Sequence, residues 1–511
     1  MTNPILLGVD IGTSDTKVLA TTLGGQEITV AATRTRWTNR SGGRAETDPE
    51  ELADSVIALM ARVVQDAADR LGAVRVAAAS FTGMAEAGVL LDRSNRPVAP
   101  IIAWFDPRGG AEIAAAPETF RVEFASRTGL PCNAMATVGK LLWMKAEGLA
   151  PHGGTWFNVP EFVAHRLGAL PATEWSLASR TGLLDQGTAD LWPTALELLG
   201  AGPGLIPPRV AAGTPLGRIG DAAPEILRGA VLTVAGHDHA VAAVGSGAVG
   251  PTDVFDSFGT AEAFVRAVDV EMAPSARSRL AEIGITTGRH VLPDRHVLLA
   301  GSKAGLLLRR TLELLGSADP DGRERLDRAA MDRLADPDRS VGVAVTGAAN
   351  TDGVLQISVD NDGTGPADLW LATIDHITAE SERLLAAMAA EVGPSERTVI
   401  AGGWTRMSSI RRAKSASLPH VRYSDRSQAG AFGAALFAAH AVEAAAVLAT
   451  ADRHDAIGID EPSGPTQEFA AAFAAGRVGV PRVARSPSDS VTDRAGAAAP
   501  ATIRTPEETR T

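Results

Sequence analysis

The sequence predicts an α/β protein made of two related domains. Runs of aliphatic and β-branched residues, typical of strands, alternate with alanine-rich helical stretches along the 511 residues. A motif of strand, glycine–threonine turn and strand lies near the N-terminus and recurs about half a chain later. A repeat of this kind indicates two domains of similar build that face one ligand.

Composition limits the classes of partner. The net charge of −12 argues against nucleic acid. The single Cys132 excludes a disulfide framework and a cysteine-based zinc site. No apolar run approaches the ~20 residues that span a bilayer, and the first residues do not have the pattern of a signal peptide. We therefore expect a cytoplasmic protein with no membrane partner.

The first hairpin, residues 5–20, has a tip suited to phosphate. Gly12 can adopt positive φ without steric cost, Thr13 and Ser14 offer hydroxyls, and the N–H groups of the turn can converge on an anion. Asp10, at the end of the first strand, is a hard oxygen ligand suited to a Mg²⁺ ion that keeps most of its waters. Taken alone, the motif is also compatible with an ordinary turn.

The second hairpin, residues 254–265, repeats the pattern around Gly259 and Thr260. Ser257 stands where the first hairpin has Asp10, so only the first is equipped for a metal. This asymmetry predicts two domains that divide the work on a single ATP.

Between and after the hairpins, further elements follow in order. The patterns predict a helix over 50–72, a strand over 74–81, a hairpin starting at 89–92 and turning at 93–96, a surface connection over 200–220, a strand over 231–236, a helix over 373–392, a strand over 398–403 and a close-packing helix over 429–446. We place the N-terminal domain at 1–245 and the C-terminal domain at 246–475. The polar tail, 476–511, cannot bury enough apolar area and is expected to be disordered.

Asp238 follows the predicted buried strand 231–236 and is placed to accept a proton from a substrate hydroxyl. Phosphoryl transfer uses such a base to orient its nucleophile. Two alternatives stay open: Asp238 caps the next helix, or it forms a metal site with His237 and His239. The metal site is disfavoured because adjacent residues rarely direct three side chains at one ion.

A second group of polar residues suits a polyhydroxylated ligand. Trp104, Asp106 and Arg108 combine a ring, an acceptor and a donor fork, although, taken alone, the segment favours a surface turn with an Asp–Arg salt bridge. Glu86 could bind hydroxyls or be an ordinary strand-edge residue. Further along, Gly402 and Gly403 would let backbone approach a flat or phosphorylated ligand, with residues 429–438 spaced to wall an adenine pocket.

These segments, in this order, resemble the FGGY family of carbohydrate kinases in the actin-like ATPase superfamily. The resemblance covers roughly residues 4–445 and rests on the motifs at 10–14, 42–49, 104–108, 128–130, 140–143, 176–183, 236–239, 257–260 and 401–403. It implies two ribonuclease-H-like domains that close over MgATP and a sugar, sugar acid or polyol in an interdomain cleft. It leaves the oligomeric state open, a homodimer being one option.

The resemblance also implies roles for residues that match the motifs of the family. Asp238 matches the general base and Asp10 the carboxylate that holds Mg²⁺ through water. The matching phosphate-binding residues are Gly12, Thr13, Ser14, Gly259 and Thr260, and the adenosine turn is Gly402 and Gly403. The positions that contact the sugar in relatives are Met84, Glu86, Trp104, Asp106 and His239.

Two departures from the family pattern indicate a divergent substrate. Ala85 stands where relatives have His or Arg, and residues 347–353 replace the usual Gly-Glu-Arg-x-Pro segment. A carbohydrate kinase is the main hypothesis. A non-catalytic ATP- or sugar-binding regulator of the same fold is the alternative, and a chaperone or cytoskeletal ATPase is a third.

Overall fold

The computed structural model describes residues 2–149, 151–336, 342–349 and 353–451, with only the backbone of 446–451. All of them belong to one compact unit, Met1–Val478. The expected tail 476–511 and part of the 347–353 segment lie outside the described residues. The boundary expected between 245 and 246 falls at the end of helix α8 (Asp238–Ser246) and stays a prediction.

The first large sheet has five strands in the order β14-β6-β1-β2-β3. Strand β1 runs antiparallel to β2 and parallel to β6, and β14 is parallel to β6. The strands are β1 (Asn3–Ile11), β2 (Asp15–Thr22), β3 (Glu27–Arg34), β6 (Val74–Gly83) and β14 (Val231–His237).

The second large sheet has six strands in the order β17-β18-β16-β15-β21-β22. Strand β15 runs antiparallel to β16 and parallel to β21. The strands are β15 (Asp253–Phe258), β16 (Glu262–Val268), β17 (Thr286–Arg289), β18 (His296–Ser302), β21 (Arg397–Ala401) and β22 (Val421–Tyr423).

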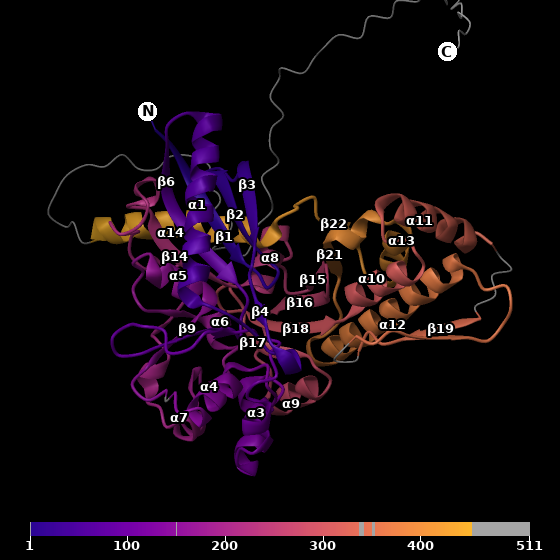
Figure 1. Ribbon diagram of the computed structural model, residues 1–511, viewed down its shortest axis with the longest axis horizontal. Helices are drawn as coiled ribbons and strands as arrows, with labels where there is room; N and C mark the ends of the chain where they lie inside the picture. Colours follow the sequence, from indigo (N-terminus) through magenta and orange to yellow (C-terminus); the bar gives the residue numbers. More distant parts are fainter. Residues whose placement is uncertain (1, 150, 337–341, 350–352, 452–511) are drawn as a thin grey trace, which may run out of the picture. The chain divides into compact units, whose positions relative to one another are not determined.

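The two sheets share one topology once β17 is set aside. In each, the strand before the glycine–threonine turn is central. On one side of it lie two strands that each run antiparallel to the neighbour before them, and on the other side lie two strands that each run parallel to theirs. The internal repeat predicted from the sequence is therefore confirmed, and so is the α/β class (Figure 1).

Long helices cover the sheets close to the predicted positions. Helix α1 (Pro49–Leu71) begins where the Asp48 carboxylate accepts the N–H groups of Glu50 and Glu51, as an N-cap does. It buries one apolar stripe of residues: Leu52, Val56, Leu59, Met60, Val63 and Val64. Helix α12 (Pro366–Val392) starts a full two turns before the predicted residue 373, because Pro366 and Asp368 open it.

Helices α8 and α14 (Ala429–Ala451) follow the last strand of each sheet and pack on one another. Gly433 lies against the carbonyl of Val241, and a Cβ at Gly245 would collide with the carbonyl of Ala429. Helix α14 also crosses the first sheet (Figure 1), where Gly8 of β1 leaves no room for a side chain beneath it. The predicted close packing of this small-residue helix is confirmed.

The predicted hairpin at 89–96 is confirmed as a short one. Asn95 lies at positive φ in the turn, the N–H of Asp92 donates to Arg96 O at 2.9 Å, and the N–H of Val98 donates to Leu90 O at 3.0 Å. In addition, β7 (Gly88–Leu91) pairs antiparallel with β9 (Thr155–Asn158). The longer pairing is the non-local one, because β7 and β9 bring buried aromatic and aliphatic side chains together, whereas the described part of the hairpin beyond the turn has the bridge from Leu91 to Pro97.

The remaining elements are shorter connections. In the first half they are β4 (Thr38–Asn39), η1 (Ser41–Gly43), β5 (Ala45–Thr47), β8 (Ile101–Ile102), α2 (Gly110–Ala114), α3 (Glu118–Thr128), α4 (Thr137–Ala146), α5 (Val159–Arg166), β10 (Thr173–Glu174), α6 (Trp175–Ala178), β11 (Leu184–Asp185), β12 (Asp190–Leu191), α7 (Pro193–Leu199), η2 (Pro203–Leu205), β13 (Arg209–Val210) and η3 (Glu225–Leu227). In the second half they are α9 (Pro274–Glu282), α10 (Ala304–Leu314), α11 (Pro320–Leu334), β19 (Val343–Thr346), β20 (Gln356–Val359), η4 (Gly403–Arg406) and α13 (Ser408–Ser417).

Candidate active site

Two carboxylates meet at one edge of the first sheet. Asp10 and Gly236 both pair with Thr82, the β6 residue between them, and Asp238 follows two residues after Gly236. The three strands are parallel, so their carboxyl ends lie at the same edge. The hydroxyl of Thr82 donates to the carbonyl of Gly236 at 2.7 Å and holds the strand ends together.

The two carboxylates are close enough for the charge of one to act on the other. Burial, together with the negative charge of Asp238, raises the pKa of Asp10 to about 7. The pKa of Asp238 moves the other way. Desolvation raises it, but the combined effect of His239, His237 and Arg180 is larger and lowers it below its usual range. Asp238 is thus ionised at neutral pH, as a proton acceptor must be.

The helix that follows positions Asp238. It is the first residue of α8, and its Oδ1 accepts the N–H of His239 at 2.7 Å. His237 is buried and its Nε2 lies 3.3 Å from the same Oδ1, while burial lowers the pKa of His237 to about 3. Neutral His237 thus supports the Asp238 carboxylate. Capping of helix α8, the alternative role for Asp238, accounts for only part of the contacts of this carboxylate.

The metal alternative finds no support in the geometry. Within the part of the chain that the structure describes, no three His, Cys, Asp or Glu side chains gather as a metal cluster. A Mg²⁺ ion held by one carboxylate through water needs no such cluster. Asp10 is half-buried and its pKa is raised even though the charge of Lys17 acts to lower it, so the carboxylate fits that ion.

The carbonyls of Gly12, Thr13 and Ser14 all accept hydrogen bonds from residues 35–37. The Thr35 hydroxyl donates to Gly12 O at 2.7 Å, and the Thr35 N–H donates to Ser14 O at 3.0 Å. The Trp37 indole donates to Thr13 O at 2.7 Å. Among the described residues, no hydrogen bond uses the N–H groups of Thr13 and Ser14. Consecutive N–H groups of this kind can bind an anion.

The second turn is built in a similar way. The N–H of Gly259 bonds Ala261 O at 3.0 Å, as that of Gly12 bonds Asp15 O at 3.2 Å. The Trp404 indole donates to Gly259 O at 2.9 Å. Gly402, at φ 130°, leaves no room for a Cβ beside the carbonyl of Phe258, which explains why glycine is needed there.

A cavity of about 580 Å³ opens beside this second turn. It is lined by Gly259, Thr260, Pro320, Arg323, Glu324, Asp327, Gly403, Trp404, Arg406 and Met407. It therefore brings together the predicted phosphate turn and Gly403 of the predicted adenosine turn. Helix residues 429–438, expected to wall it, do not line it. They pack on the first sheet instead, where Gly430 faces the Asp10 carboxylate.

Two of the predicted sugar-contacting residues, Met84 and Glu86, lie near the first turn and Asp238. Met84 is buried, and its N–H donates to Ile11 O at 3.0 Å, beside the first turn. Glu86 is buried at positive φ and pairs with Arg180, whose Nε donates to Oε1 at 2.6 Å. Glu86 is therefore not an ordinary strand-edge residue, and it lies near Asp238 through Arg180.

Asp106 forms the salt bridge of the alternative interpretation, but in the interior rather than on the surface. Its Oδ1 and Oδ2 accept from Arg108 at 3.0 and 2.7 Å, and Oδ2 also accepts the Ala45 N–H at 2.7 Å. Arg108 continues to Glu46 at 2.9 Å. This network suits a carboxylate that shapes the 104–108 segment better than one that binds a ligand directly. A sugar contact by Asp106 stays a prediction.

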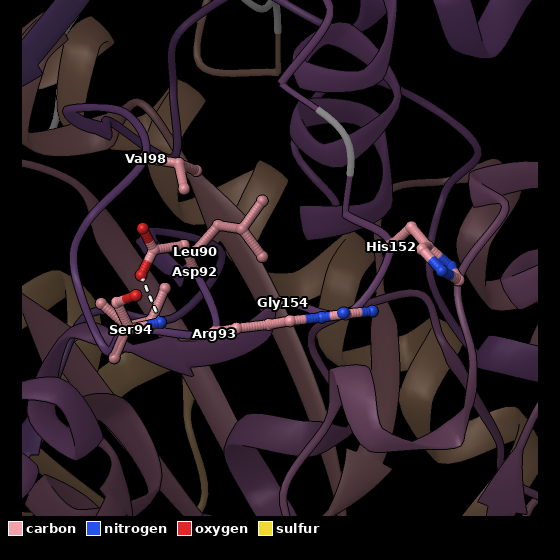
Figure 2. Close-up of a pocket in the computed structure, with 9 residues that line it drawn as sticks. Leu90, Asp92, Arg93, Ser94, Val98, His152 and Gly154 are labelled. Carbon is pink, nitrogen blue, oxygen red and sulfur yellow. Dashed lines mark hydrogen bonds between the residues drawn. The ribbon is translucent and has the colours of Figure 1, made fainter.

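A separate cavity of about 270 Å³ lies along β7 and the 152–154 segment (Figure 2). Its polar lining includes Arg93, Ser94 and His152, and Asp92 supports the turn by accepting the Ser94 N–H at 2.7 Å. None of the predicted site residues lines it.

Sequence reasoning missed three side chains that organise the site: Arg180, His237 as a support, and Trp404. Arg180 is buried and its Nη1 also donates to Thr286 Oγ1 of β17 at 2.6 Å, so it joins the first half to the second sheet. The motif at 176–183 marked its position, but its partners lie about a hundred residues away in the chain. No local pattern could reveal them.

The N-terminal part of the chain is similar to a known protein family. A sequence model described as "FGGY family of carbohydrate kinases, N-terminal domain" matches residues 5–245. This match places residues 5–245 in the FGGY family. This segment contains Asp10, the first turn and Asp238.

Individual relatives of this FGGY protein act on different compounds. A gluconokinase of Bacillus subtilis is 27% identical over 201 residues, which are 39% of this chain and 38% of that protein. A glycerol kinase of Rhodospirillum centenum is 30% identical over 214 residues, 40% of this chain and 43% of that protein. The matched segments thus span less than half of either relative.

Solved structures of FGGY kinases show the same fold over nearly the whole chain. A xylulose kinase from Rhodospirillum rubrum superposes with a TM-score of 0.73 at 20% identity, covering 92% of this chain and 98% of that one. Plasmodium falciparum glycerol kinase with ADP gives 0.77 at 16% identity, covering 93% of each. At these identities the likeness is one of fold. Among the described residues, no helix has the length and apolarity to cross a membrane.

Proposed function

We propose that this FGGY protein is an ATP-dependent carbohydrate kinase that transfers the γ-phosphoryl group to a hydroxyl of a sugar, sugar acid or polyol. The observation that carries the proposal is the pair Asp10 and Asp238 at one sheet edge, beside a turn whose N–H groups are available to an anion. A protein that only binds ATP or sugar needs neither a proton acceptor nor a second carboxylate next to it.

In the proposed reaction, Asp238 is the general base. The acceptor oxygen bonds to the γ-phosphorus, the bond from that phosphorus to the bridging oxygen breaks, and ADP leaves with that oxygen. The proton of the acceptor hydroxyl passes to Asp238, whose lowered pKa keeps it ionised and ready to accept. Charge stabilisation by the turn contributes most of the acceleration in phosphoryl transfer.

The phosphates would lie against Gly12, Thr13 and Ser14 on one side and Gly259 and Thr260 on the other. Asp10 would hold Mg²⁺ through water, and the ion when bound would neutralise phosphate charge. The adenosine would occupy the 580 Å³ cavity beside Gly402 and Gly403. Closing of the two halves over both ligands would exclude water from the transfer.

The acceptor would lie between Asp238 and the segment that contains Trp104. Met84, Glu86 and His239 would contact it, while Asp106 would shape the segment through Arg108. Ala85 offers no polar group at a position where relatives have one. We therefore expect an acceptor that differs from gluconate, glycerol and xylulose in the hydroxyl or carboxylate facing this position.

A panel of acceptors with MgATP tests the proposal. Pentuloses, hexuloses, tetruloses, aldonates and polyols are each incubated with the purified chain, ADP release is recorded, and the phosphorylated product is identified by mass. We expect one class to raise ADP release well above the acceptor-free rate. ATP binding without turnover on any compound would favour the regulator, and sugar-independent slow hydrolysis would favour the chaperone or cytoskeletal ATPase.

A further inference from the structure

The hydroxyl of Thr13 is held by a tryptophan from a distant segment. The Trp104 indole Nε1 lies 2.9 Å from Thr13 Oγ1, a contact between residues 91 positions apart in the chain. Indole nitrogen can only donate, so the hydroxyl is the acceptor in this bond. A threonine hydroxyl has one proton, and this contact leaves that proton available for another acceptor.

The surroundings of Trp104 keep the indole in place. The Nζ of buried Lys140 donates to the Trp104 carbonyl at 3.2 Å. The indole meets Phe105 edge-on at 5.5 Å, and Phe105 meets Trp37 edge-on at 6.2 Å. Trp37 in turn donates to the Thr13 carbonyl. Two indoles thus hold one residue, one at its backbone and one at its side chain.

We propose that Trp104 is a positioning residue for phosphoryl transfer, whose indole N–H orients the Thr13 hydroxyl so that its proton is directed to a phosphate oxygen. Since accepting one hydrogen bond strengthens the next bond that a hydroxyl donates, the contact also makes Thr13 a better donor. Trp104 thereby couples the acceptor side of the site to the phosphate turn. This inference rests on the proposed function for the identity of the anion.

The two indole contacts on Thr13 provide the test and its control. Trp104→Phe keeps an aromatic ring but removes the N–H that binds the hydroxyl. Trp37→Phe removes the N–H that donates to the backbone carbonyl of Thr13. Thr13→Val leaves that carbonyl in place. The affinity for a non-hydrolysable ATP analogue, AMPPNP with Mg²⁺, is measured by calorimetry for each variant and for the double variants with Thr13→Val.

We expect Thr13→Val to weaken AMPPNP binding roughly tenfold and Trp104→Phe to weaken it by about threefold to tenfold. The double variant Trp104→Phe/Thr13→Val should bind like Thr13→Val alone, because both changes act through one hydroxyl. In the double variant Trp37→Phe/Thr13→Val, the losses of AMPPNP affinity caused by the two single changes should multiply. Thr13→Ser, which keeps the hydroxyl, should bind more tightly than Thr13→Val, and this outcome separates loss of the hydroxyl from general disturbance of the turn.

Two results would overturn the coupling: effects of Trp104→Phe and Thr13→Val that multiply, or a Trp104→Phe variant with wild-type AMPPNP affinity. A failure of the proposed function looks different. A wild-type chain that binds AMPPNP but phosphorylates no acceptor would refute the kinase and still return a clear result for the coupling. A wild-type chain that does not bind AMPPNP would refute both.

Discussion

The two glycine–threonine hairpins have the same strand topology but different charges around them. In the first, Asp10 is half-buried two residues before Gly12, and Asp238 lies nearby. In the second, Asp256 is fully buried and one residue earlier relative to its glycine, so alternation along the strand directs it to the opposite face from Asp10. Ser257 occupies the position that matches Asp10.

The second hairpin also balances its own charge. Lys414 of α13 is buried, lies 3.0 Å from Asp256, and pairs with Glu262 at the start of β16. Burial and the charge of Glu262 raise the pKa of Asp256 to about 7. The carboxylates of Asp256 and Glu262 in turn raise the pKa of Lys414, against the effect of burial. One hairpin thus presents negative charge to the site, whereas the other encloses it. The difference teaches that a duplicated fold can assign chemistry to one copy and ligand holding to the other.

The largest expected effect follows from Asp238→Asn. This change removes the proton acceptor while keeping the size of the side chain, so kcat should fall by roughly 10²–10⁴-fold. Affinity for MgATP, measured by calorimetry, should stay near that of the wild type. A variant that keeps substantial turnover would show that Asp238 is not the base and that the first half does not carry the chemistry.

Lys414→Met tests the enclosed charge of the second hairpin. The variant leaves two carboxylates in the interior without their cation, and the free energy of unfolding should fall by about 3–5 kcal/mol. Lys17→Met on β2 of the first hairpin is the matched control, because Lys17 is partly exposed. It should cost less than about 1 kcal/mol in urea unfolding. Equal losses for the two lysines would remove the contrast.

Asp10→Asn tests the half-buried charge of the first hairpin. If Asp10 holds Mg²⁺ through water, the Mg²⁺ concentration for half-maximal activity should rise by roughly tenfold to a hundredfold. Asp15→Asn, on the same hairpin and paired with exposed Arg34, is the control and should leave Mg²⁺ dependence unchanged. An unchanged Mg²⁺ requirement in Asp10→Asn would contradict the metal assignment.

The smallest effect concerns stability against pH. Beneath the Asp238 edge, Glu161 and Glu174 are buried with N–H and hydroxyl partners, and burial raises the pKa of each to about 8. The folded state therefore holds more protons than the unfolded state between about pH 4.5 and 8, and stability falls as pH rises through that range. The urea midpoint of Glu174→Gln should depend on pH less steeply. A slope equal to that of the wild type would contradict these pKa shifts.

The local parts of this account could be predicted from the sequence. Both hairpins, the strand before Asp238 and the helices after Asp48 and over 429–446 depend on turn residues, caps and periodicity that lie within a few positions. The partners of these elements could not be predicted. Glu86 meets Arg180, Lys414 meets Glu262, and β7 pairs with β9, each through contacts between distant segments.

The same limit applies within the candidate site. Thr13 could be predicted from its turn, and Trp104 from its ring and polar neighbours. Their contact depends on how residues 104–108 pack beside β1, which no spacing in the chain encodes. Lys414 is buried, but its neighbours in the sequence of α13 include serines and arginines, which is the local pattern of a solvated helix face.

The most direct measurement is a crystal structure of the chain with AMPPNP and Mg²⁺. The account predicts phosphate oxygens within hydrogen-bond distance of both turns, at 12–14 and 259–260, with the base in the cavity beside Trp404 and Asp238 facing the γ-phosphate. A nucleotide bound elsewhere, for example in the cavity between Arg93 and His152, or one that contacts a single turn with Asp238 remote from it, would contradict the account.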